Sequence, residues 1–406
     1  MPRLRKAFAV KKLLVRARPA LANTLLVLIS LLASYVALEY ATFRVFLPSE
    51  PLDIHSRVPE LADVLTQATK SSYLPKDYVA ILGDSYAEGL GDWLTQNGGK
   101  RNGPFHSAYV IRQLTGRDVV SFGVRSAGSA EGIVLRPAGA LPTSPCSIFP
   151  AIEPPRQMFI YFYEGNDIED NIRFLDKVRA RYGASDDGAI DRYLVEDYAD
   201  SSLLRCHGQL ADMTFKLAEF LSQYYITGFS VTHCGTWVST RNALRVGEAV
   251  VEAPALEGPA PHLPDDSIMA AMNVFARSLK WLRRRFPAMP VTVVYVPSPL
   301  SVYRHAAETV AFCSPTGGGP IGADVFARHH LMMRDAAARM SAAAHVDFVD
   351  ATPALRAAGE TRVIHGPEDW DHLNKDGYEV LGKLVAARVQ GEPEDVRLQT
   401  VGAVMK

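Results

Sequence analysis

The sequence of 406 residues has almost no net charge, because 43 Lys and Arg side chains are balanced by 44 Asp and Glu side chains, which gives a formal value of −1 at pH 7. Proteins that bind nucleic acids usually carry a basic excess that attracts the phosphate backbone. The overall composition therefore gives no indication of a nucleic-acid partner, and we expect none.

Cysteine is scarce, and its four positions follow no spacing typical of a zinc site. Two of the cysteines have a histidine as chain neighbour, but adjacent side chains seldom point at one ion, so we predict no metal. Disulfides are permitted outside a reducing compartment, and four cysteines allow three complete pairings. We favour Cys206 with Cys234, because both fall within one predicted insertion.

A phosphate-binding loop is missing as well. The glycine-rich run at residues 316–320 lacks the Gly-Lys-Ser/Thr ending of such loops and follows no predicted strand. It is expected to form a flexible surface loop, and no cofactor is predicted.

Only one stretch is apolar for long enough to cross a membrane. Residues 20–38 contain five polar side chains and no charge, and residues 1–19 before them carry seven Lys or Arg residues and no acid. We predict that 1–19 form a basic cytoplasmic tail and that 20–47 form a single-pass anchor in the inner (cytoplasmic) membrane. The rest of the chain then faces the periplasm or the exterior. A cleaved signal peptide would have a shorter apolar core, so we favour an uncleaved anchor.

Beyond the anchor, the sequence predicts a linker and one large domain. Residues 48–77 are polar and punctuated by proline, as is typical of a spacer. Residues 78–392 alternate continuous apolar runs with helical patterns, which indicates a parallel sheet covered on both faces. The expected strands lie at residues 78–82, 118–122, 158–163, 291–296 and 346–349. Residues 170–286 depart from this pattern and are expected to form an insertion near the active face, and 393–406 form a C-terminal tail.

Residues suited to nucleophilic chemistry lie near both ends of this domain. The first expected strand ends in a Gly-Asp-Ser sequence whose serine is Ser85, and a helix beginning there would direct free N–H groups at the serine oxygen. A serine becomes nucleophilic only when an imidazole takes its proton and a carboxylate orients that imidazole. His372 and Asp369, three residues apart, satisfy this second requirement, with Asp371 as the alternative acid. For an isolated Gly-Asp-Ser, helix capping by Ser85 is the simpler interpretation.

Two further segments supply hydrogen-bond donors. Asn166 follows the strand at 158–163, where a side-chain amide can donate to developing negative charge. Ser126 and Gly128 follow the strand at 118–122, and their backbone N–H groups can join the same oxyanion hole. Ligands of parallel sheets bind at the carboxyl ends of strands, where all these residues fall.

We assign no catalytic role to four other polar residues. Tyr86 and Glu164 adjoin the predicted site and are expected to line its pocket. His329 and His330 lie in a predicted helix, where one is expected to be exposed and the other packed.

These segments, in this order, resemble the blocks of the SGNH (GDSL-like) hydrolase superfamily, named for its serine, glycine, asparagine and histidine. The resemblance implies a flavodoxin-like, three-layer α/β/α sandwich with a central parallel sheet. It also implies roles: Ser85 is the nucleophile, Asn166 the oxyanion-hole amide, His372 the general base and Asp369 its orienting acid.

The second block departs from the family pattern. Ser121 stands where family members often have Asn, and an ungapped match places Ser126 at the position of the second glycine. Gly128 fits only after a local shift. The third oxyanion donor is therefore expected to be either Ser126 or Gly128.

The resemblance implies acyl transfer through a covalent acyl-enzyme. We expect a membrane-anchored serine esterase that hydrolyses an O-acyl ester, in the first place an O-acetyl ester, on an envelope or exported carbohydrate. Hydrolysis is favoured because the Gly-Asp-Ser and Asp-x-x-His forms resemble the hydrolases more than the alginate-acetylating relatives. The alternatives are an O-acyltransferase to polysaccharide, a lysophospholipase or thioesterase, and a non-catalytic binding module with the SGNH fold.

Overall fold

The structure is a computed structural model that describes residues 22–38, 67–72, 74–91, 106–141, 152–199, 240–314 and 316–391, together with residues 19, 41, 64 and 238. The chain divides into two units, Met1–Ser49 and Glu50–Lys406, which are described separately. The predicted C-terminal tail lies outside the described residues.

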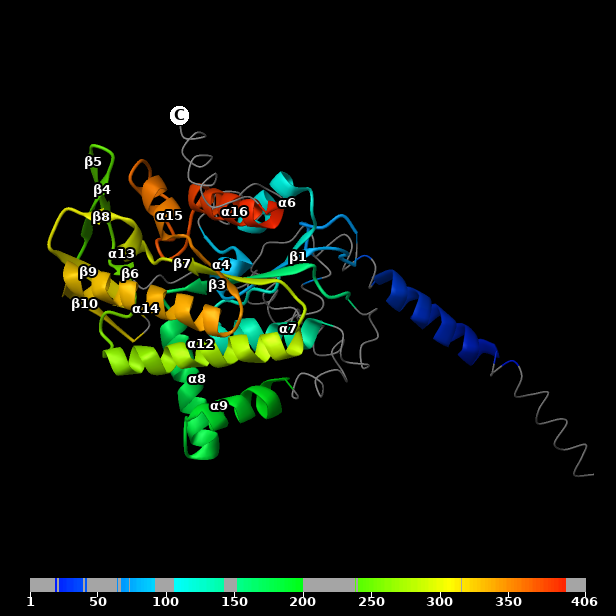
Figure 1. The fold of residues 1–406 in the computed structure, drawn as a ribbon. Coiled ribbons are helices and arrows are strands. Elements are labelled where there is room, and N and C mark those ends of the chain that lie inside the picture. The colour runs from blue at the N-terminus through cyan, green and yellow to red at the C-terminus, as the bar shows by residue number, and fades with distance from the viewer. Residues whose placement is uncertain are drawn as a thin grey trace, which may run out of the picture. The chain divides into compact units, whose positions relative to one another are not determined.

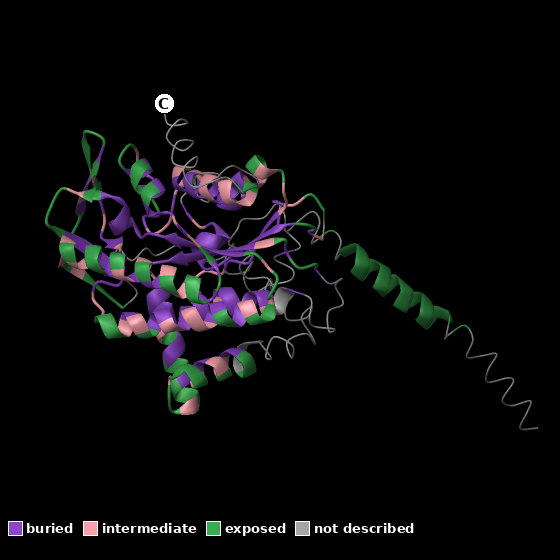
Figure 2. Ribbon diagram, in the orientation of Figure 1, coloured by how far each residue is buried: buried purple, intermediate pink, exposed green. Residues whose placement is uncertain are grey.

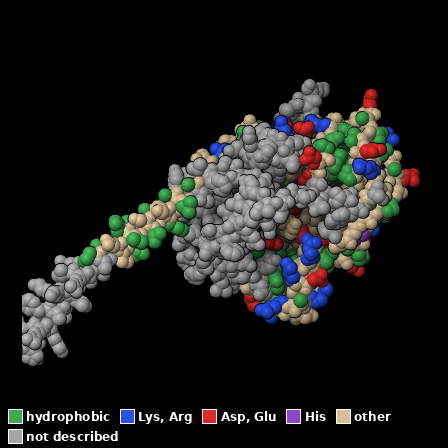
Figure 3. Space-filling model, turned by 180° about the vertical axis from the view of Figure 1, so that it is seen from behind, with side chains coloured by type: hydrophobic (Ala, Val, Ile, Leu, Met, Phe, Trp, Pro, Cys, Tyr) green, Lys and Arg blue, Asp and Glu red, His purple; other side chains and the backbone are tan. Residues whose placement is uncertain are grey.

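In the first unit, residues 22–38 form a helix whose side chains are all exposed (Figure 2). Hydrophobic side chains are frequent along it (Figure 3), among them Leu26 and Leu32, which are 65% and 64% exposed. Within the described residues, no helix is both long and apolar enough to span a membrane. The remainder of the expected anchor, except residue 41, lies outside the described residues, as does the expected basic tail except residue 19.

The second unit is built on a five-stranded sheet of β1 (Val79–Leu82), β2 (Val119–Ser121), β3 (Gln157–Tyr163), β7 (Val291–Val296) and β11 (Asp347–Asp350). The strand order is β11-β7-β3-β1-β2, and every neighbouring pair is parallel. The predicted parallel sheet is thus confirmed, with each strand within one residue of its expected bounds. Because β1 lies between β3 and β2, the residues that follow it are flanked on both sides by the carboxyl ends of neighbouring strands.

Helices cover both faces of this sheet, as expected for a three-layer α/β/α sandwich (Figure 1). One layer contains α8 (Asp167–Tyr182), α12 (Asp265–Arg285) and α14 (Ala323–Ala343), and the other contains α6 (Ser107–Thr115), α15 (Thr352–Gly359) and α16 (Lys375–Gln390). Successive strand residues point to opposite faces. Accordingly, Ile160 and Phe162 of β3 pack into the core under α8 and α12, whereas Phe159 and Tyr161 pack into the core under α6 and α16.

The expected insertion contributes both to the sandwich and to a small β lobe. After α8 come α9 (Asp187–Tyr193) and the π-helix η4 (Leu194–Ala199), followed beyond residue 240 by β4 (Asn242–Val246), β5 (Ala249–Ala253) and β6 (Leu256–Glu257). These strands join β8 (Arg304–His305), β9 (Thr309–Ser314) and β10 (Gly317–Gly322) in two three-stranded sheets, β5-β4-β8 and β10-β9-β6. The lobe therefore combines the insertion with the segment that follows β7.

The glycine-rich run forms a strand, so the prediction of a flexible loop was wrong. β10 pairs antiparallel with β9, from Gly317 opposite Ser314 to Gly322 opposite Thr309. Glycine is disfavoured in strands because it packs no side chain. The residues of β10 are exposed or half-buried, so backbone pairing with β9 holds the strand without side-chain packing.

Part of the expected linker packs against the sheet. Gln67 exchanges two hydrogen bonds with the backbone of Ser121, of 2.5 and 2.7 Å. The carbonyl of Thr69 accepts the Val119 N–H at 2.9 Å. β2 is an edge strand, so the backbone groups on its outer side have no neighbouring strand to bind. Residues 67–72 supply hydrogen-bond partners for them and cover this edge.

Candidate active site

Ser85 lies where β1 turns into the short helix α4 (Ser85–Glu88). Gly83 makes this turn with a φ of +139°, which other residues rarely adopt, and a Cβ there would lie 2.5 Å from the carbonyl oxygen of Tyr161. Asp84 caps α4, because its carboxylate accepts the backbone N–H of Tyr86 at 2.9 Å. The capping role that the sequence also allowed for Ser85 therefore belongs to Asp84. The Ser85 hydroxyl contacts Asp84 Oδ2 at 3.4 Å and has a second, closer partner.

The loop before α16 supplies that partner. His372 Nε2 lies 2.8 Å from Ser85 Oγ, and His372 Nδ1 lies 2.8 Å from Asp369 Oδ2. Asp369 Oδ1 also accepts the backbone N–H groups of Asp371 and His372, at 3.1 and 3.2 Å. Asn374 ends the loop by capping α16 through its side-chain oxygen. Asp369 is thus the acid at the imidazole, and the cap fixes where the loop meets the helix.

Negative charge around His372 favours its protonated form. Burial alone would lower the pKa of His372, but Asp369, with smaller contributions from Asp371 and Glu257, outweighs burial and raises the pKa to about 9. Beside Ser85, complete burial raises the pKa of Asp84 to about 6. This environment stabilises the imidazolium that forms when the ring takes the serine proton.

The three expected oxyanion donors lie around the start of α8. Asn166 precedes this helix, its Nδ2 donates to Asp170 at 3.2 Å, and its buried Oδ1 has no partner among the described residues. Ser126, Gly128 and Asp170 line one recess of about 40 Å³. Within the described residues, none of the three donors hydrogen-bonds to Ser85, so their place in an oxyanion hole stays a prediction.

Backbone geometry accounts for the residues of the second block, the segment that contains Ser121, Ser126 and Gly128. Ser126 has a φ of +56°, a left-handed conformation that glycine adopts at lower cost. A Cβ at Gly128 would lie 2.7 Å from Asn171 Oδ1. Ser121 donates to the carbonyl of Ala87 at 2.6 Å and accepts a backbone N–H two residues on at 3.0 Å. These bonds tie the block to α4 and thereby to Ser85.

A pair of tyrosines flanks the imidazole. Tyr86 stacks on Tyr163, with ring centroids 4.2 Å apart, and its centroid lies 5.4 Å from that of His372. The Tyr86 hydroxyl donates to the carbonyl of Asp371 at 2.7 Å, and the Tyr163 hydroxyl donates to Glu257 at 2.8 Å. The sequence indicates Tyr86 as a neighbour of the site, but it gives no signal for Tyr163 or Glu257, because Glu257 reaches the site only through the folding of the β lobe.

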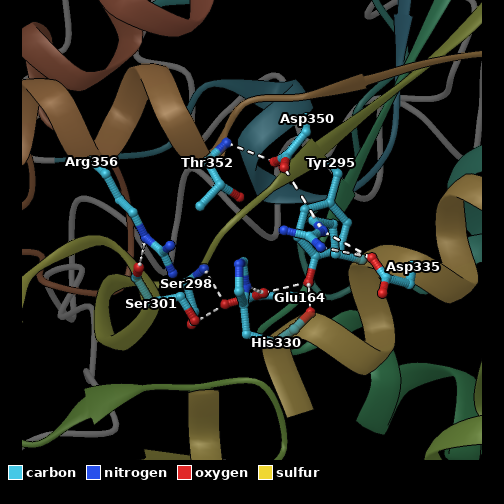
Figure 4. A network of polar contacts seen from close by, with 10 residues as sticks. Glu164, Tyr295, Ser298, Ser301, His330, Asp335, Asp350, Thr352 and Arg356 are labelled. Atoms are coloured by element: carbon cyan, nitrogen blue, oxygen red, sulfur yellow. Dashed lines mark hydrogen bonds and ion pairs between the residues drawn. The ribbon is translucent and has the colours of Figure 1, made fainter. Parts of the chain in front are cut away.

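A second histidine–carboxylate pair lies inside the sandwich (Figure 4). Glu164 is fully buried, accepts a hydrogen bond from the Tyr295 hydroxyl and two from Ser298, and lies 2.5 Å from His330 Nδ1. Burial alone would raise the pKa of Glu164, but His330 and the hydroxyl donors lower it to about 2. Two expectations are wrong here. Glu164 does not line the pocket, because it is fully buried. His329 and His330 are both buried, because His329 Nδ1 meets the carbonyl oxygen of Ala260 at 3.2 Å and His330 Nδ1 meets Glu164.

Cys313, on β9, is disulfide-bonded. The other three cysteines lie outside the described residues, so the pairing of Cys206 with Cys234 stays a prediction. Within the part of the chain that the structure describes, no group of three or more His, Cys, Asp or Glu side chains is placed to hold a metal ion.

No family model and no curated protein matches the sequence. Among solved structures, the chain is similar to an extracellular lipase from Streptomyces rimosus, with 14% identity, coverage of 77% of this chain and 99% of that chain, and a TM-score of 0.38. It is also similar to phospholipase A1 from Streptomyces albidoflavus NA297, with 12% identity, coverage of 78% and 99%, and a TM-score of 0.37. At these values the likeness carries no argument about activity, so the inference of function rests on the site itself.

Proposed function

We propose that the protein is a serine esterase that passes an acyl group from its substrate to Ser85 and then to water. The observation that carries this proposal is the continuous contact from Ser85 through His372 to Asp369, with 2.8 Å at each step. His372 Nε2 takes the Ser85 proton while Ser85 Oγ attacks the ester carbonyl, and the same proton then passes to the departing alcohol. Water, deprotonated by His372 in the same way, releases the acid and restores Ser85.

The oxyanion formed in each step needs donors that are already in place. We assign these to the backbone N–H of Ser85, the backbone N–H of Ser126 or Gly128, and the amide of Asn166. The amide nitrogen of Asn166 carries two hydrogens, and one of them bonds to Asp170. The other is available to the substrate.

The proposed substrate is an O-acyl ester, in the first place an O-acetyl ester, of an envelope or exported carbohydrate. The apolar run at 20–38 and its basic flank support an inner-membrane anchor that places the catalytic unit in the periplasm or outside the cell. The disulfide at Cys313 supports the same placement, because disulfides persist in oxidising compartments.

The test compares the purified full-length protein with its Ser85→Ala variant on p-nitrophenyl acetate. The substitution is expected to lower kcat/KM at least about a thousandfold, and a fluorophosphonate probe should label the wild-type protein alone. Equally slow hydrolysis by both proteins would indicate a non-catalytic module and overturn the proposal. Acetylation of an added sugar would identify a transferase, and faster turnover of long-chain esters would identify a lipid hydrolase.

A further inference from the structure

The β lobe places a carboxyl group near the loop that carries His372. Glu257 ends β6, which pairs in parallel with β9. Its Oε2 accepts a hydrogen bond of 2.8 Å from the Tyr163 hydroxyl, and its Oε1 takes part in no hydrogen bond among the described residues. Since Tyr163 is the last residue of β3, this contact fixes Glu257 at the carboxyl edge of the central sheet, where the triad lies.

The contact continues from Tyr163 to the loop that carries His372. The Tyr163 hydroxyl lies 3.5 Å from the carbonyl oxygen of Asp371, to which the stacked Tyr86 donates at 2.7 Å. The carboxyl of Glu257 is therefore connected through one hydroxyl to the residue next to the catalytic imidazole. It lies close enough to His372 for the two groups to affect each other's pKa.

The surroundings of Glu257 favour its neutral form. Burial, followed by the carboxylates of Asp371 and Glu169, raises the pKa of Glu257 well above its usual range, against the opposing effects of the Tyr163 hydroxyl and His372. A neutral carboxyl group can both donate and accept a hydrogen bond. It attracts a cation far less than a carboxylate does, so it suits a hydroxyl group better than an ammonium group.

A further group of polar side chains meets at the first turn of α8, where Glu169 lies near enough to raise the pKa of Glu257. Glu169 accepts the Thr316 hydroxyl at 3.0 Å and lies 3.5 Å from His262 Nε2. Hydroxyl, imidazole and carboxyl groups match an alcohol with several hydroxyls, whereas a lipid tail would need apolar contacts.

The chemistry of the triad says which part of the substrate meets this lining. His372 returns its proton to the oxygen of the departing alcohol, so the alcohol portion of the ester must lie on the imidazole side of the site. We propose that Glu257, positioned by Tyr163, binds a hydroxyl group of that alcohol and makes the site selective for esters of polyols such as sugars. This inference rests on the proposed function and adds the recognition of the alcohol to it. Glu257 gains and loses no proton in the reaction.

The experiment measures kcat/KM for three acetate esters: an acetylated xylo-oligosaccharide, ethyl acetate and acetylcholine. The wild-type full-length protein is expected to prefer the sugar ester. Glu257→Ala should lower kcat/KM for the sugar ester about tenfold more than for ethyl acetate, because one substrate hydrogen bond is lost. Glu257→Gln should retain part of the preference, since an amide also donates and accepts. Glu252→Gln, on the exposed face of β5, is the matched control and should behave as the wild type.

Three outcomes would overturn this inference: no wild-type preference for the sugar ester, an equal loss on all three esters in Glu257→Ala, or a selective loss on acetylcholine. The last two would indicate a structural role and a cation site, respectively. Ser85→Ala, assayed in parallel, distinguishes a failure of the proposed function from a failure of the role of Glu257. If it retains activity, the proposed function fails, and if it is inactive while Glu257→Ala shows no selectivity, only the role of Glu257 fails. Thermal unfolding of each variant shows whether it is folded.

Discussion

Among the histidine–carboxylate contacts of the described residues, the two shortest lie in different surroundings. The distance is 2.8 Å from His372 Nδ1 to Asp369 and 2.5 Å from His330 Nδ1 to Glu164. His372 Nε2 faces the Ser85 hydroxyl, whereas His330 Nε2 is buried without a hydrogen-bond partner in the described part of the chain. The side chain of His372 is 16% exposed and that of His330 is 1% exposed. An imidazole paired with a carboxylate is therefore a candidate base only where its second nitrogen meets a transferable proton and a substrate.

Replacing each histidine by alanine is the strongest test of this contrast. His372→Ala should lower kcat/KM on p-nitrophenyl acetate about 10⁴-fold, because Ser85 loses its base. Its thermal midpoint at neutral pH should fall as well, because the protonated ring paired with Asp369 stabilises the folded protein, so kcat/KM is compared per folded molecule. His330→Ala should retain most of the kcat/KM per folded molecule and lose stability instead, since the ring contacts no reacting group. Comparable losses of activity in both folded variants would show that the two pairs do not differ in this way.

Removing the acid of the buried pair should cost stability. Glu164→Ala leaves His330 and the donors of Ser298 without their acceptor, and breaking a buried pair costs about 3–5 kcal/mol. Urea unfolding followed by circular dichroism measures the loss. Glu164→Gln is the control, because it preserves the volume and one acceptor oxygen and should lose less. An unchanged urea midpoint in Glu164→Ala would show that the pair contributes no net stability.

The two pairs should respond to pH in separate ranges. The pKa of Glu164 is about 2 in the folded protein, against an ordinary 4.5, so its stabilisation is complete above pH 4.5 and is lost as pH falls towards 2, a loss of roughly 3 kcal/mol. The pKa of His372 is raised from 6.5 to about 9, so its stabilisation is complete below pH 6.5 and is lost as pH rises through 9. Over that same range kcat/KM should rise, because only the neutral imidazole accepts the Ser85 proton. Unfolding and kinetic profiles measured at matched pH values check both ranges, and a kcat/KM that levels off below pH 7 would contradict the raised pKa of His372.

Ser85, Asp369 and His372 could be singled out from the sequence because each lies in a short, recognisable segment, and the order of these segments resembles a known family, although Ser85 and His372 are 287 residues apart. Ser85 follows a short apolar strand directly, and Asp369 lies three residues before His372, so neither placement required knowledge of distant contacts. The continuous apolar runs also predicted the five parallel strands, since burial on both faces leaves that pattern.

The buried pair and the lining of the site were not accessible in this way. Glu164 and His330 are 166 residues apart, and no motif or regular spacing links them, so the sequence gives no sign of their contact. Glu257 reaches the site only because β6 pairs with β9, and β10 is held by backbone hydrogen bonds, which leave no side-chain pattern. Contacts between distant segments decide all of these features.

The smallest expected effect concerns the segment that joins the site to α8. Ser126 adopts a φ of +56°, which costs a non-glycine residue about 1–2 kcal/mol, whereas glycine adopts it freely but loses more chain entropy on folding. Ser126→Gly should therefore raise the free energy of unfolding by at most about 1 kcal/mol. It should keep kcat/KM within about threefold of the wild type, because the backbone N–H that we assign to the oxyanion hole remains and only the side chain is removed. A loss of a hundredfold or more would mean that the Ser126 hydroxyl, and not its N–H, meets the substrate.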